Sequence, residues 1–79
     1  MEALYDRVLE LVRALRDSGR AEAADGLLAA LTQACSPREI LMELRYAAAD
    51  LDVEALTPEL RSGRTALLEE VERQWQGLA

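Results

Sequence analysis

The chain has 79 residues, of which 51% are hydrophobic and 30% charged, and leucine and alanine are its most frequent residues. This composition predicts one helical domain, residues 1–79, with a single small core. Its 15 acidic residues outweigh nine arginines, and a net charge of −6 argues against nucleic acid and anionic membranes as partners, because both need a basic surface. Histidine is absent, which removes imidazole catalysis and the usual zinc sites.

The N-terminal segment predicts an amphipathic helix over residues 2–17. Its apolar face has the spacing of an α-helix and consists of Leu4, Val8, Leu11, Val12 and Leu15. Acidic residues interrupt this segment, so we expect neither a secretion signal nor a membrane span. The helix is expected to end at Ser18-Gly19, with Gly19 in the left-handed conformation.

A second helix is predicted over residues 21–34. Its inward face would consist of Ala24, Leu27, Leu28, Leu31 and Ala34. Gly26 lies inside this helix, where glycine costs about 1 kcal/mol relative to alanine. We therefore expect Gly26 to mark a close contact with a neighbouring helix.

The third predicted helix, residues 37–51, has the strongest start signal. Ser36 is expected to cap it, Pro37 to occupy its first position and Glu39 to complete a capping box. Cys35 and Ile40 have the spacing of a hydrophobic staple, which would partly bury Cys35. A single cysteine cannot form an internal disulfide, so we expect a reducing, cytoplasmic location.

A fourth helix is predicted over residues 58–76, opening at Thr57-Pro58, with a weak point at Ser62-Gly63 where it bends or starts late. Its apolar face would consist of Leu60, Leu67, Leu68, Val71 and Trp75. The short connections place consecutive helices antiparallel, which predicts an all-α, compact four-helix arrangement.

Two charge patterns concern the fourth helix. Glu69 and Arg73 have the i,i+4 spacing of a favourable surface pair. Arg64 interrupts the apolar face, and we expect it to pair with an acid of a neighbouring helix.

The third helix carries a second apolar stripe opposite its main face. Met42, Tyr46 and Ala49 form this stripe, and Arg45 at its edge has no acid three or four residues away. Either the fourth helix covers the stripe, or it lies at the surface and contacts a partner. Methionine and tyrosine suit a contact surface, so Met42, Arg45, Tyr46 and Ala49 are the candidate interaction surface.

Two further patterns resemble known sites only in part. Asp50, Asp52 and Glu54 begin like a calcium loop, but alanine replaces its glycine and arginine its final glutamate, so we expect no bound metal or cofactor. An acidic four-helix chain with an Asp-Ser pair resembles an acyl carrier protein in outline, with Ser18 as the modified residue. That serine ends a helix instead of opening one, so a carrier role is the minor alternative.

The stretch S-x-x-E-I-L-M-x-L-R, from Ser36 to Arg45, resembles a segment of small uncharacterised helical proteins of bacteria. The lysine-free, arginine-rich composition also indicates a bacterial source. We expect a non-enzymatic protein-interaction module. A regulatory or toxin-neutralising (immunity-like) partner of a basic protein would be one such module. The alternative is a structural domain that self-associates as a homodimer.

Overall fold

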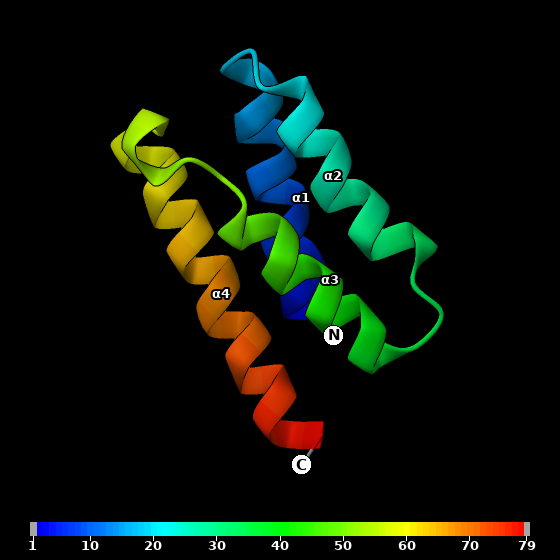
Figure 1. Ribbon diagram of the computed structural model, residues 1–79. Helices are drawn as coiled ribbons and strands as arrows, with labels where there is room; N and C mark the ends of the chain where they lie inside the picture. Colours follow the sequence, from blue (N-terminus) through cyan, green and yellow to red (C-terminus); the bar gives the residue numbers. More distant parts are fainter. Residues whose placement is uncertain (1, 79) are drawn as a thin grey trace.

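The computed structural model describes residues 2–78 of the chain, and within them it is all-α, as predicted. The helices are α1 (Glu2–Asp17), α2 (Ala21–Gln33), α3 (Pro37–Ala49) and α4 (Pro58–Leu78), with a short 3₁₀ helix, η1 (Val53–Ala55), before α4 (Figure 1). The observed ends differ from the predicted ends by two residues or fewer. No strand occurs in this part of the chain.

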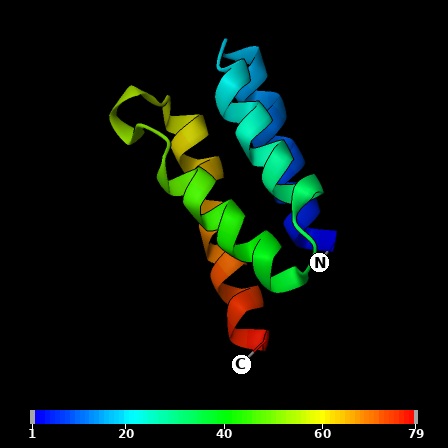
Figure 2. The same ribbon diagram turned by 45° about the vertical axis from the view of Figure 1, so that its right-hand side comes forward.

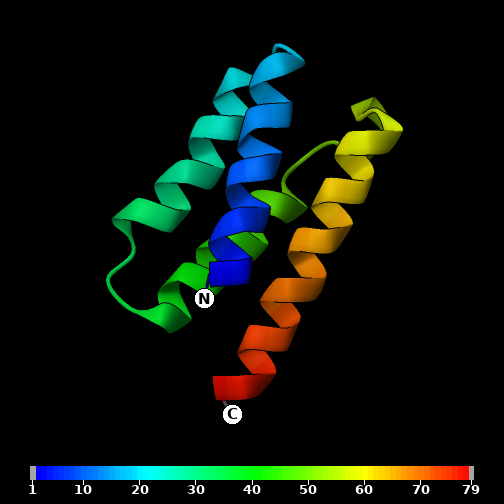
Figure 3. The same cartoon turned by 180° about the vertical axis from the view of Figure 1, so that it is seen from behind.

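The four helices alternate in direction, and each packs mainly against two others: α1 against α2 and α4, and α3 against α2 and α4. Figure 2 shows α2 and α3 in front of α1 and α4. In Figure 1, α3 lies at the front between α2 and α4, whereas Figure 3 shows α1 at the front from behind. Helices α1 and α3 therefore occupy diagonal positions, and their outer faces point to opposite sides of the molecule.

All four helices contribute to one core. The five predicted apolar residues of α1 are buried, as are Leu27 of α2 and Leu41 and Leu44 of α3. The fully buried large side chains are almost all leucines, each of which stabilises the fold by about 1.5–3 kcal/mol. Leu60, Leu67 and Val71 of α4 complete the core. Other residues of the predicted faces are only partly buried: Leu28, Leu31, Ala34, Leu68 and Trp75.

The turn between α1 and α2 has the predicted left-handed glycine. Gly19 has φ +77°. The amide of Gly19 donates to the carbonyl of Arg16 over 3.0 Å, and the amide of Arg20 donates to that of Leu15 over 2.8 Å. These two bonds form a Schellman motif, which satisfies the last carbonyls of α1 and reverses the chain.

The start of α3 forms the predicted cap but not the predicted staple. The Ser36 hydroxyl accepts a hydrogen bond from the Glu39 amide over 3.2 Å. The Glu39 carboxylate accepts from the amide of Cys35, also over 3.2 Å, one residue before the cap. Cys35 itself is exposed, because the extended connection after α2 loops outward from the bundle (Figure 1). Its expected burial against Ile40 was wrong.

The close helix contact predicted at Gly26 occurs instead at Gly63. A Cβ on Gly26 would have no atom within 4 Å, whereas a Cβ on Gly63 would lie 3.2 Å from Cδ1 of Leu11. Gly26 lies on the exposed side of α2, and Gly63 faces α1. Helix α4 starts at Pro58 and runs through Ser62-Gly63, so the expected late start was also wrong.

The connection between α3 and α4 is held by arginine side chains. Arg64 donates from Nε to the carbonyl of Ala48 over 2.8 Å, which corrects the expected pairing with an acid. Arg61 donates from Nε to the carbonyl of Val53 over 2.9 Å, and Arg20 donates to the carbonyl of Ala55. Guanidinium groups from two separate parts of the chain thus bind backbone carbonyls at the end of α3 and in η1. The carbonyls of Ala48 and Val53 also accept from the amides of Leu51 and Leu56, over 3.3 and 3.2 Å.

The ion pair on α4 uses Glu70 and not the predicted Glu69. Glu70 is 4% exposed, and its carboxylate accepts from Arg73 over 2.8 Å and from Gln74 over 3.1 Å. The i,i+3 spacing brings Arg73 to Glu70, and the arginine itself stays largely in solvent. Among the charged residues within 2–78, Glu70 is the one that is buried.

Candidate interaction surface

The second apolar stripe of α3 lies at the surface. Met42 is 39% exposed, Tyr46 is 64% exposed, and Ala49 is also exposed. Helix α4 packs against α3 on another side, so the alternative in which α4 covers the stripe does not hold. We call Met42, Arg45, Tyr46 and Ala49 the outer face of α3.

The core side of α3 fixes the direction of this outer face. Leu41, Leu44 and Ala48 are buried against the rest of the bundle, and they recur at helical spacing. Met42 follows Leu41 by one residue, and Tyr46 follows Leu44 by two. At these positions the side chains lie on the side of the helix that faces solvent. The outer face therefore belongs to a helix whose opposite side is packed into the core.

Arg45 is exposed at the edge of the outer face. Within residues 2–78, its guanidinium makes no hydrogen bond or ion pair. Of the two possible sources of a partner, another helix of this chain or another molecule, no helix supplies one within the described residues. The five donors of this guanidinium are available to a carboxylate of another molecule.

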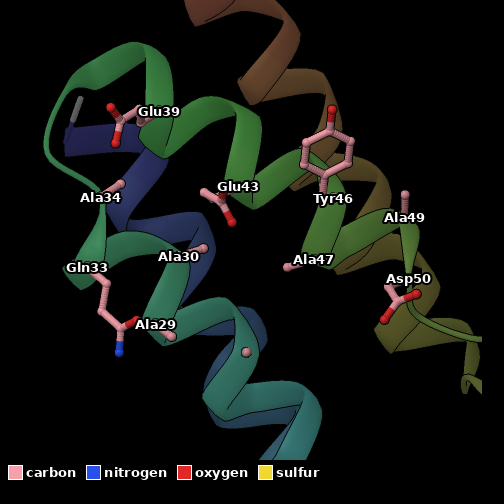
Figure 4. A pocket seen from close by; sticks show the side chains of 11 residues that line it. Ala29, Ala30, Gln33, Ala34, Glu39, Glu43, Tyr46, Ala47, Ala49 and Asp50 are labelled. Atoms are coloured by element: carbon pink, nitrogen blue, oxygen red, sulfur yellow. The ribbon is translucent and has the colours of Figure 1, made fainter.

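A groove of about 730 Å³ lies beside the outer face, between α2 and α3. One wall consists of small residues and one glutamine of α2: Gly26, Ala29, Ala30, Gln33 and Ala34. Figure 4 shows Ala29 and Ala30 on the α2 side of the groove and Glu39, Glu43, Tyr46 and Asp50 on the side of α3 and its C-cap. We call this feature the α2/α3 groove, and Tyr46 and Ala49 belong both to it and to the outer face.

The α3 wall of the groove carries a row of polar groups. Glu39, Glu43, Tyr46 and Asp50 follow one another at i, i+4, i+7 and i+11, which places them in one line along the helix. Within the described chain, the carboxylates of Glu43 and Asp50 have no hydrogen-bond or ion-pair partner. No arginine lines the groove. Its negative charge is therefore uncompensated.

The arginine that precedes Glu39 is engaged elsewhere. Arg38 lies in the first turn of α3, and its guanidinium carbon lies 5.6 Å from the ring centroid of Trp75 in α4. This contact draws Arg38 toward α4, away from the groove, and is favourable because the ring face is negative.

A second hollow, of about 410 Å³, lies between α1 and α4 and differs in charge. Its rim includes Arg7, Glu10 and Glu59, and Arg7 lies 3.9 Å from Glu10. Tyr5 and Leu9 of α1 are exposed nearby in the sequence, at 38% and 49%. The sequence analysis missed this apolar pair, although its i,i+4 spacing beside the predicted core face could have revealed it. The α2/α3 groove is the hollow that carries charge of one sign.

The other motifs noted in the sequence lie in the turn after α1 and at the start of η1. Ser18 lies exposed in the turn after α1, and its amide donates to the carbonyl of Ala14 over 3.1 Å. The Asp52 carboxylate accepts from the amide of Glu54 over 3.2 Å and caps η1. Among residues 2–78, no group of three histidine, cysteine or acidic residues could hold a metal ion, and no helix is long and apolar enough to cross a membrane.

Comparison of the chain with protein-family models, with curated proteins and with solved structures finds no match.

Proposed function

We propose that this chain is a non-enzymatic protein-interaction module that binds its partner through the outer face of α3. The observation that carries the proposal is the exposure of Met42 and Tyr46 on a helix whose opposite side is anchored in the core. An exposed thioether and phenol next to one another supply adaptable apolar contact and a hydrogen-bonding group, as contact surfaces commonly do.

The charge of the chain supports a basic protein as the partner. The net charge is −6, and the groove beside the outer face is lined by three acids and no base. Complementary charge raises the rate of association and selects against acidic partners. A regulatory or toxin-neutralising role in a bacterial cytoplasm fits such a partner, and the exposed thiol of Cys35 suits a reducing compartment.

The second candidate is a homodimer in which the outer faces of two copies meet. Arg45 lies at one edge of the stripe and Glu43 at the other. A two-fold axis parallel to α3 would bring Arg45 of each copy toward Glu43 of the other. Analytical ultracentrifugation decides this point, because a monomer at all concentrations contradicts self-association.

The proposed surface is tested with a pair of matched variants. Met42→Gln with Tyr46→Gln removes the apolar and aromatic groups of the outer face without adding charge. Tyr5→Gln with Leu9→Gln makes the corresponding change on α1, where the exposed pair has the same i,i+4 spacing. Tagged forms of the protein and both variants are used to isolate partners from the native host.

We expect the wild type and the α1 variant to recover the same partner and the α3 variant to lose it. Circular dichroism should show equal helicity for all three forms, because none of the four residues is buried. Recovery of the same proteins by both variants would show that the outer face of α3 is not the binding surface. A loss of helicity in the α3 variant would instead show that its side chains support the fold.

A further inference from the structure

We infer that the α2/α3 groove receives an amphipathic helix of the partner that carries arginine or lysine at i, i+4 and i+11, or at i, i+7 and i+11 in the opposite direction. This inference names the partner segment for the proposed interaction function and rests on that function. It follows from the shape of the groove, from its charge and from the spacing of its acids.

The shape of the groove suits a helix. Gly26, Ala29 and Ala30 carry little or no side chain on the α2 wall, and a Cβ on Gly26 would meet nothing within 4 Å. Small side chains let the backbone of a third helix approach closely, since interaxial distances of about 8–10 Å depend on the residues at the contact. An amphipathic helix can therefore lie in the groove between the antiparallel helices α2 and α3.

The charge of the groove selects a basic occupant. Glu39, Glu43 and Asp50 line it, and Glu43 and Asp50 have no partner among residues 2–78. A second copy that docked with its own outer face of α3 would bring Arg45 together with the same three acids. A basic segment of another protein complements the groove better than a second copy does.

The spacing of the acids sets the register. Asp50, the C-cap of α3, lies eleven residues after Glu39, which corresponds to about 16 Å along the helix axis. A helix lying alongside must therefore present its basic side chains with the same separations to meet all three carboxylates. The remaining place in the row belongs to Tyr46, whose exposed ring can stack with a guanidinium.

The probe is a helical peptide of about 16 residues, built from alanine and leucine, with arginine at i, i+4, i+7 and i+11. This pattern reads the same in both directions, so it fits either orientation. A second peptide of identical composition carries its four arginines spread around the helix. Isothermal titration calorimetry at low ionic strength measures the affinity of the full chain for each.

Two protein variants distinguish the effect of the charges in the groove from the effect of the net charge of the chain. Glu39→Gln, Glu43→Gln and Asp50→Asn remove three charges from the groove while keeping side-chain size, and the side-chain carbonyl that replaces the Glu39 carboxylate can still accept from the Cys35 amide. Asp6→Asn, Asp17→Asn and Glu69→Gln remove three charges from exposed positions outside the groove. We expect the aligned peptide to bind the groove variant about tenfold more weakly than the wild type or the control variant.

Three results would overturn the inference: equal affinity for both peptides, equal weakening by both variants, or no binding of the aligned peptide. A concentration-dependent dimer that the peptide dissociates would identify a second copy as the occupant and would also overturn it. The proposed function is tested by a different experiment. It is contradicted if the Met42→Gln/Tyr46→Gln variant and the Tyr5→Gln/Leu9→Gln variant recover the same partner. If only the peptide test fails, the outer face of α3 remains the proposed docking surface, with a different partner segment.

Discussion

Arg64 of α4 donates a hydrogen bond from Nε to the carbonyl oxygen of Ala48, 2.8 Å away, in the last turn of α3. The same carbonyl accepts from the amide of Leu51 over 3.3 Å, so the guanidinium is a second donor. Its positive charge is favourable there, because the C-terminus of a helix carries partial negative charge. This bond joins two consecutive helices at the point where α3 ends and the connection to α4 begins. It also holds in place the helix that carries the candidate interaction surface.

Replacing Arg64 with methionine should lower the free energy of unfolding by about 1.5 kcal/mol, because a charged donor to a half-buried carbonyl is lost. Urea denaturation followed by circular dichroism measures the change. Arg13→Met is the matched control, since Arg13 is exposed on α1 and makes no hydrogen bond or ion pair within residues 2–78. Equal midpoints for the two variants would show that the Arg64 bond does not stabilise the fold.

Two glycines in helix interiors should respond in opposite ways to alanine. Gly26→Ala should raise the free energy of unfolding by about 1 kcal/mol, because alanine favours the helix and the new Cβ meets nothing within 4 Å. Gly63→Ala should bring no gain, because its Cβ would lie 3.2 Å from Cδ1 of the buried Leu11 and must displace it. Thermal denaturation of both variants is the measurement, and an equal gain at Gly63 would mean that α1 and α4 adjust freely there.

Ser36→Ala should lower the free energy of unfolding by about 1 kcal/mol, because the Glu39 amide loses the hydroxyl that caps α3. Ser18→Ala serves as the control, since Ser18 lies exposed in a turn. Chemical denaturation compares the two midpoints. The capping role is refuted if Ser36→Ala is no less stable than Ser18→Ala.

Glu70→Leu should leave the protein as stable as the wild type or raise the free energy of unfolding by about 1 kcal/mol. The carboxylate is buried and its desolvation is costly, whereas its partner Arg73 is largely in solvent and is not stranded by the change. Glu69→Leu, at an exposed position, should bring no such gain. A loss of 2 kcal/mol or more (about the scale of a broken buried pair) for Glu70→Leu would show that its bonds to Arg73 and Gln74 stabilise the end of α4.

The sequence alone determined several local features of this protein. The five apolar residues of α1, the Gly19 turn and the Ser36 cap follow from helical spacing and from backbone preferences that act over a few residues. The doubled face of α3 could be read in the same way, because an apolar stripe opposite the core face is a property of one helix.

Which neighbour covers each face was decided only by the tertiary structure. The spacing of α3 left two places for Met42 and Tyr46, and the packing of α4 on another side leaves both exposed. The Arg64–Ala48 bond, the burial of Glu70 and the α2/α3 groove also went unpredicted. Helical periodicity states which side of a helix is apolar, but the rotation and depth at which two helices pack depend on side chains from both, and these are far apart in the sequence.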